Sequence, residues 1–167
     1  MTLQKSDVVI FDDRNHLIAS FVDDEPFVPT DYDFRPVSSS TACRRGYLCV
    51  YEVRDGLLVL DAFHVNHEEG RVPASLLKRP PPLNGVEARE STMPDVGRWM
   101  FERIGLRLRY TGRVRIGREP YRESHPELRF LSPTKFVKVL ELTFEDGMLT
   151  AVQDLSEALV DSDSHGV

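Results

Sequence analysis

The sequence predicts a mainly β domain of the α+β class, either an antiparallel sheet or a partly open barrel, with one or two short helices. Short apolar runs rich in β-branched and aromatic residues recur along the chain between turn-forming residues, which is typical of β-strands. No regular alternation of strands with long helices is visible, so a parallel doubly wound sheet is not expected. The length of 167 residues and the 41% content of hydrophobic residues fit one folded domain.

We place this single domain at residues 1–160 and expect residues 161–167 to form a disordered tail. Acidic residues near the start argue against a secretion signal, and no apolar run approaches the ~20 residues that span a membrane. The sequence therefore predicts a cytoplasmic protein with no membrane partner. Cys43 and Cys49 are expected in one strand, about 20 Å apart, and hence as free thiols.

The first half of the chain predicts two hairpins joined by a loop. Residues 7–11 and 16–22 are apolar runs on either side of a polar turn. Residues 23–41 contain three prolines and a run of serines, which predicts an irregular loop. Residues 46–66 show the strongest hairpin pattern, because the Asp-Gly pair in the middle suits the positive φ angles of a tight turn. The second half of that hairpin, residues 57–65, is nearly all apolar and is expected at the centre of the sheet.

The second half of the chain contains the predicted helices. The triple proline at 80–82 requires a surface connection. Residues 91–105 begin with capping residues and then space their apolar side chains for one face of a helix. A second short helix is indicated by the capping-box pair Asp154 and Glu157. Residues 133–153 predict a further hairpin around an Asp-Gly turn.

Residues 104–116 alternate apolar with polar positions and predict one long strand. On such a strand four arginines lie on one side with about 6 to 7 Å between neighbours, namely Arg107, Arg109, Arg113 and Arg115. This row suits an anionic ligand, and Arg45 is a further candidate for the same ligand site. Nucleic acid is not expected there, because the net charge is -6 and no aromatic platform accompanies the cations.

A structural interpretation of the arginines competes with the ligand site. In the segment from 136 to 145 the even positions Leu140, Leu142 and Phe144 are apolar, and the odd positions Glu141, Thr143 and Glu145 are polar. If this strand lies beside the arginine strand, arginine and glutamate face each other as cross-strand ion pairs. The question is whether the two glutamates account for all four arginines.

Two histidines and a Ser-Thr-Cys stretch are candidates for a metal site and for a nucleophile. His64 and His67 are ligand types for zinc or iron, but residues three apart on a strand point to opposite faces. The polar end of a strand is the alternative for this pair, and no cofactor is predicted. Ser40, Thr41 and Cys43 have no base at a recognisable spacing, and the chain has no known nucleophile motif. The sequence therefore assigns no catalytic residue, and a non-enzymatic role is favoured.

One segment resembles a family of small uncharacterised bacterial proteins with no assigned activity. The shared pattern is a Ser-Thr-Ala stretch, an Arg-Gly-Tyr step, an aromatic-Glu-aliphatic step and an Asp-containing turn. Here these positions are Ser40, Thr41, Ala42, Arg45, Gly46, Tyr47, Tyr51, Glu52, Val53 and Asp55. A later Gly-x-Leu-Arg-Ile strand of the family resembles Gly112, Val114, Arg115 and Ile116. The resemblance implies a bacterial, cytoplasmic, β-rich domain, and some such proteins act as immunity factors beside toxins.

The charge distribution favours a protein-binding function. Residues 1–34 hold eight acidic and two basic residues, and residues 141–167 hold seven acidic residues with no lysine or arginine. We therefore expect a non-enzymatic protein-binding module, for example an inhibitor of the immunity type, whose acidic ends meet a basic partner. The alternative is a small enzyme or binding domain that holds an anionic small molecule on the arginine-lined sheet face. The oligomeric state is left open.

Overall fold

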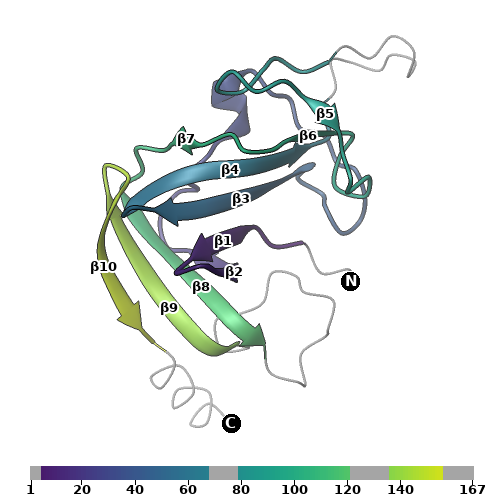
Figure 1. Cartoon of the computed structure of the whole chain (residues 1–167). Coiled ribbons are helices and arrows are strands. Elements are labelled where there is room, and N and C mark those ends of the chain that lie inside the picture. The colour runs from purple at the N-terminus through teal and green to yellow at the C-terminus, as the bar shows by residue number, and fades with distance from the viewer. Residues whose placement is uncertain (1–4, 68–78, 121–135, 156–167) are drawn as a thin grey trace.

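The computed structural model describes residues 5–67, 79–120 and 136–155. The elements in this part of the chain are β1 (Val8–Phe11), β2 (Arg14–Phe21), the 3-10 helix η1 (Pro29–Tyr32), β3 (Tyr47–Arg54), β4 (Leu57–Val65), β5 (Arg89–Glu90), β6 (Trp99–Phe101), β7 (Leu106–Arg107), β8 (Gly112–Pro120), β9 (Phe136–Glu145) and β10 (Met148–Asp154). The mainly β class is confirmed (Figure 1).

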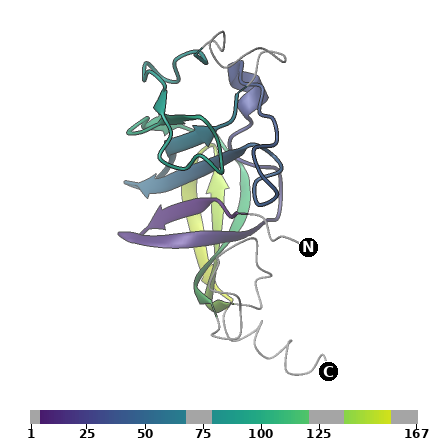
Figure 2. The ribbon, with the colours of Figure 1, turned by 90° about the vertical axis from the view of Figure 1, so that its right-hand side faces the viewer.

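Seven strands form a closed barrel in the order β10, β9, β8, β2, β1, β3 and β4, and β4 meets β10 to complete the ring. The expectation of an open sheet or a partly open barrel is therefore wrong. The closing contacts are main-chain hydrogen bonds from Leu149 to Gly56 and from Leu58 to Gly147, both 2.8 Å from nitrogen to oxygen. The strands β8 to β10 cross β3 and β4 steeply (Figures 1 and 2).

One strand pair departs from the antiparallel expectation. β1 runs parallel to β3, with Val8 opposite Val50 and Ile10 opposite Glu52, whereas the other pairs are antiparallel. Because parallel neighbours cannot be joined by a tight turn, the chain between β2 and β3 must cross the barrel. Residues 22–46 make this crossover, which confirms the predicted irregular loop.

The crossover loop is anchored by aromatic residues. Phe27 and Phe34 are each 1% exposed, and both pack edge-on against Phe63 of β4 with ring centroids 5.1 Å apart. Phe34 also contacts Phe101 of β6. Edge-to-face contacts of this kind add to the free energy gained by burying each ring. The loop is therefore part of the hydrophobic core.

Tight turns join three of the antiparallel strand pairs of the barrel. The two central residues of each turn have positive φ angles of 50° to 81°: Asp12-Asp13, Asp55-Gly56 and Asp146-Gly147. Positive φ at both positions is the type I′ geometry, which matches the twist of paired strands. The two Asp-Gly turns confirm the predicted hairpins, and β2 begins directly after Asp13.

The predicted helix over residues 91–105 is wrong. Residues 94–96 form a turn, and residues 99–101 form β6, which pairs with β4 so that His64 faces Met100. Val96 is fully buried with Cys43 and Leu48 on the outer side of β3. The helical spacing of apolar residues therefore reflects burial in two separate clusters. The described residues contain no α-helix.

The single strand predicted over residues 104–116 is also wrong. β7 is two residues long, residues 108–111 are not strand, and β8 starts at Gly112. β7 pairs with β4, whereas β8 pairs with β2 and β9, so the chain leaves one edge and joins another. Asp154 ends β10, and its predicted capping partner Glu157 and the tail at 161–167 lie outside the described residues.

A buried carboxylate joins the start of the barrel to the crossover loop. Asp7 is fully buried, forms an ion pair with Arg45, and accepts a hydrogen bond of 2.8 Å from the main-chain nitrogen of Cys49. Arg45 also donates to Glu25 at 3.2 Å, and the Tyr47 hydroxyl donates to the other oxygen of Glu25 at 2.8 Å. Burial lowers the pKa of Arg45, but Asp7 raises it by more, so the guanidinium stays protonated.

Gly46 has a steric role beside this cluster. Its φ is +78°, and a Cβ at this position would collide with the main chain of Val37. Main-chain hydrogen bonds from Val37 to Asn66 and from Asn66 to Gly46 hold the three segments together. The glycine of the Arg-Gly-Tyr step is therefore required by close packing of the loop against the end of β4.

Both cysteines are buried free thiols, as expected, although only Cys49 lies in a strand. Among the residues that the structure describes, no helix has the length and apolar character needed to span a bilayer.

We predict that Asp7→Asn destabilises the fold by about 2 to 3 kcal/mol, because it breaks the ion pair between the buried Asp7 carboxylate and the partly buried Arg45. The free energy of unfolding is measured by urea denaturation followed by tryptophan fluorescence. Asp24→Asn is the matched control, since Asp24 is exposed, and its effect is expected to stay within about 0.5 kcal/mol. Equal effects of the two substitutions would contradict the structural role of Asp7.

Candidate functional site

The structure separates the five arginines that the sequence suggested for an anionic ligand. Arg45 lies in the buried cluster with Asp7, Arg107 lies on β7, and Arg109 lies in the link to β8. Arg113 and Arg115 lie on β8, in the phase opposite to its buried Val114 and Ile116. None of the five lines any of the cavities described below. They do not form one site.

Arg115 and Glu141 form the cross-strand ion pair that the alternation predicted. The two residues are register partners on β8 and β9, and Arg115 Nε donates to Glu141 Oε2 at 2.9 Å. Glu141 is 8% exposed, so the arginine satisfies a nearly buried carboxylate. Glu145 lies at the end of β9 opposite Met148 and does not face an arginine. The predicted cross-strand ion pair is therefore confirmed between Arg115 and Glu141, whereas the prediction that Glu145 also faces an arginine is wrong.

The other exposed arginines are held loosely. Arg113 Nε lies 3.8 Å from Asp23, whose carboxylate also accepts the main-chain N–H of Arg113 at 2.9 Å. Arg107 and Arg109 are exposed, and the described residues contain no ion-pair partner for either. Exposed ion pairs contribute little to the stability of a fold, so none of these three arginines is expected to hold the structure together.

The two histidines face different surroundings. His67 Nδ1 accepts a hydrogen bond of 2.9 Å from the main chain of Arg35, and the ring packs on Phe34. It lines a cavity of about 410 Å³ beside η1. His64 lines another cavity, of about 350 Å³, on the outer side of β1 and β3. No group of three or more metal-ligand residues gathers within the described ranges.

His64 contacts a hydroxyl in a geometry that suits general-base chemistry. Its Nδ1 lies 3.1 Å from Ser91 Oγ, within the range of a nucleophile and its base. The same Ser91 oxygen accepts the main-chain N–H of Met93 at 3.0 Å, which fixes the hydroxyl in a local turn. We therefore interpret the contact between His64 and Ser91 as a structural one, which stabilises the conformation of the 91–98 loop.

The other nucleophile candidates also have structural partners. Ser40 Oγ donates to the main-chain oxygen of Asp95 at 2.8 Å, and Cys43 Sγ contacts the main-chain oxygen of Tyr47. Thr41 is exposed in the adjoining turn. Burial and then Asp7 raise the pKa of the Cys49 thiol well above its usual value, so this thiol stays protonated.

The most accessible feature of the barrel is the edge of β10. β10 pairs with β4 only at Met148, because β7 and β6 occupy the rest of that edge of β4. A bulge between Leu149 and Ala151 lies where the pairing with β4 ends. From Ala151 to Gln153, β9 is the only strand partner found in the described part of the chain.

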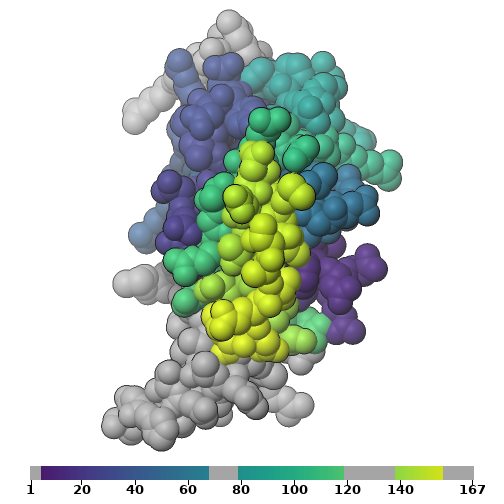
Figure 3. Space-filling view, turned by 90° about the vertical axis from the view of Figure 1, so that its left-hand side faces the viewer, coloured from purple at the N-terminus to yellow at the C-terminus, as the bar shows by residue number. Residues whose placement is uncertain are grey.

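β10 is exposed on both of its faces. Every residue except Leu149 is exposed, and Met148 and Val152 are 55% and 47% exposed despite being apolar. Figure 3 shows β10 in yellow along the middle of one face, uncovered by other described segments. A strand with one open edge and exposed apolar side chains is a template for pairing with another strand.

Carboxylates gather beside the turn that precedes β10. The turn contains Asp146, whose main-chain N–H donates to Thr111 Oγ1 at 2.9 Å, and Asp23 is held close by through Arg113. Burial, followed by Asp23 and Asp24, raises the pKa of Tyr110 to about 12 in this region. Asp23 and Asp146, which are far apart in the sequence, therefore lie near each other at this end of the barrel.

The two β8 arginines give a matched test. Arg115→Ala is expected to cost about 1 to 3 kcal/mol of unfolding free energy, because it removes the hydrogen-bond donor of a nearly buried carboxylate. Arg113→Ala is expected to cost less than about 0.5 kcal/mol, since both members of its pair are about half exposed. Chemical denaturation of the two variants measures both values. Equal costs would show that Glu141 gains nothing from Arg115.

The buried histidines predict acid sensitivity. Burial lowers the pKa of His16 and of His64 below the ordinary value of 6.5, so the unfolded chain takes up protons first as the pH falls. The contribution of the neutral histidines to the free energy of unfolding is therefore complete well above pH 6.5, and it declines as the pH falls through 6.5. Urea denaturation at about pH 7.5 and about pH 5.5 measures the decline. His64→Gln is expected to reduce the decline, and an unchanged decline would exclude His64 as a cause.

No family model, curated protein or solved structure matches this chain. The resemblance of the segment from Ser40 to Asp55 to a bacterial family stays a prediction.

Proposed function

We propose that the protein is a non-enzymatic protein-binding domain, whose β10 edge pairs with an extended, basic segment of a partner protein. The observation that carries the proposal is the one-sided pairing of β10 from Ala151 to Gln153, combined with the exposure of both strand faces. Pairing of this kind satisfies main-chain groups of both chains, and side chains at alternate positions supply specificity.

Charge determines the kind of partner. Residues 141–167 of the sequence contain seven acidic residues and no lysine or arginine, and Glu145, Asp146 and Asp154 lie at the two ends of β10, so we expect the strand to favour a cationic partner. A second copy of this chain is disfavoured as the occupant, because antiparallel pairing of two β10 edges brings acidic segments together. A basic strand, in contrast, is attracted by the acidic residues near β10. An immunity-type inhibitor of a basic toxin is one protein of this kind.

The alternative function was an anionic ligand on an arginine-lined sheet face. The five candidate arginines are spread over the crossover loop, β7, the link to β8 and β8 itself, and two of them are paired with carboxylates at 3.2 Å or less. We therefore do not propose a ligand site made from these residues.

Peptide selection on the full chain tests the proposal. Peptides selected from a random library are expected to be rich in Lys and Arg, and their binding is expected to slow hydrogen exchange of the amides from Ala151 to Gln153. Val152→Lys is expected to weaken binding about tenfold, because it adds a positive charge and removes an apolar contact. Val22→Lys is the matched control, since Val22 is an exposed valine (38%) outside β10, and it is expected to bind as the parent does.

Selection of acidic peptides, or protection of amides elsewhere in the barrel, would contradict this function. Equal loss of binding in the Val152→Lys and Val22→Lys variants would show a general charge effect without a role for β10. Thermal unfolding of both variants checks that they are folded. Both side chains are exposed, so neither substitution removes a core contact.

A further inference from the structure

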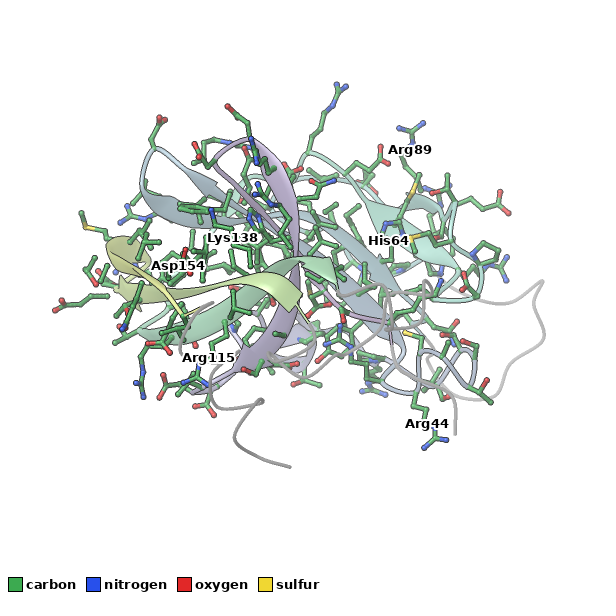
Figure 4. The ribbon with its side chains drawn as sticks, turned by 90° about the horizontal axis from the view of Figure 1, so that it is seen from below. Arg44, His64, Arg89, Arg115, Lys138 and Asp154 are labelled. Atoms are coloured by element: carbon green, nitrogen blue, oxygen red, sulfur yellow. The ribbon has the colours of Figure 1, made fainter. Side chains whose placement is uncertain are left out.

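The inner face of the barrel changes from apolar to basic at the end where β8 finishes and β9 begins. On β8 the buried Ile116 is followed, two positions later on the same side, by Arg118. On β9 the buried Leu140 is preceded in the same way by Lys138. Figure 4 shows Lys138 within the ring of strands and Arg115 outside it. The two cations thus continue the inward-facing phase of the core.

β2 contributes the same kind of residues at this end. Ile18 is a core residue, and His16 and Arg14 precede it in the same phase. Leu17 is the register partner of Gly117, so His16 and Arg118 are the next residues along these two neighbouring strands. Four positively charged or titratable side chains from β2, β8 and β9 therefore converge on one place.

The register sets like charges against each other. Arg118 and Lys138 are direct partners across β8 and β9, and like charges at such positions destabilise a sheet. Lys138 and Arg14 have no ion-pair partner among the described residues, whereas Arg118 has a further interaction of its own. Burial lowers the pKa of His16, and Arg118 and Lys138 lower it further. The positive charges of Arg118 and Lys138 therefore lie close to His16.

A cavity of about 220 Å³ lies at this end of the barrel. Arg14, His16, Arg118 and Lys138 line it together with two apolar side chains, Phe11 and Leu140. The one carboxylate in its lining is Asp12, and Asp154 faces Leu140 across β9 and β10 without lining the cavity. Three permanent cations therefore exceed the negative charge supplied by the cavity wall.

We propose that this cavity binds the phosphate group of a small phosphomonoester. A phosphate dianion compensates more of the local positive charge than a single carboxylate, and arginine and lysine both donate hydrogen bonds to phosphate oxygens. Phe11 and Leu140 provide an apolar wall for the organic group attached to the phosphate. The site uses residues other than those of the β10 edge, so it does not depend on the function proposed above.

The proposal explains why a lysine stands opposite an arginine. Arg118 and Lys138 repel each other directly as register partners, whereas a bound anion attracts both groups. Replacement of Lys138 by a neutral residue is therefore expected to stabilise the empty protein and to weaken phosphate binding. A purely structural lysine has the opposite effect on stability.

Titration of the full chain tests the site, with inorganic phosphate, phenyl phosphate and acetate as probes at constant ionic strength. Calorimetry measures affinity, and the melting temperature measures stability. Phenyl phosphate is expected to bind more tightly than inorganic phosphate, and acetate weakest. Lys138→Gln and Arg14→Gln are each expected to weaken phenyl phosphate binding about tenfold or more. Lys138→Gln is also expected to raise the melting temperature of the ligand-free chain.

Arg107→Gln is the matched control, because Arg107 is an exposed arginine that does not line the cavity, and it is expected to bind phenyl phosphate as the parent does. Absence of binding of both phosphate probes overturns the proposal. So does an equal loss of affinity in Arg107→Gln, or equal affinity for inorganic and phenyl phosphate. A lower melting temperature of Lys138→Gln would show that the lysine is paired within the chain, and would also overturn it.

Discussion

The barrel depends on the buried carboxylate of Asp7. Its side chain accepts the amide of Cys49 on β3 and pairs with Arg45, while its main-chain oxygen accepts the amide of Ile18 on β2. One residue therefore connects β2, β3 and, through Arg45 and Glu25, the crossover loop. This connection matters because the parallel pairing of β1 with β3 requires a long crossover, and ordering such a loop costs conformational entropy. The cluster and the two buried phenylalanines of the loop offset that cost.

Closure of the barrel explains the exposed strand. β4 offers one edge to three partners in turn, so β10 meets it at Leu57, β7 at Val59 and Leu60, and β6 from Phe63 onward. Since β7 occupies the next positions, β10 cannot follow β4 further and diverges with an open edge. Natural proteins usually protect such edges. An edge that is left open by the topology, and lies in the most acidic part of the sequence, is consistent with a role in binding a basic strand.

Local chemistry determined which features were predictable. The Asp-Gly turns require positive φ angles, and strand alternation places Arg115 opposite Glu141 once β8 and β9 are neighbours, so both could be inferred from the sequence. The helix at 91–105 was wrong because its apolar spacing serves two clusters, and the open edge of β4 that recruits β6 is not visible locally. The Asp7–Arg45 pair spans 38 residues and leaves no local pattern. Glu25 was missed for the same reason.

The arginines show how phase decides the role of a charge in a strand. At the odd positions of β8, Arg113 and Arg115 point away from the core and have carboxylate neighbours. Arg118 has the other parity and therefore continues the inward phase of Val114 and Ile116. A polar residue in the phase of the core loses hydration unless something replaces water. A charged side chain at an inward-facing strand position is thus stronger evidence for a ligand than one at an outward-facing position. In this barrel the inward-facing charged residues lie on β2, β8 and β9 around one cavity.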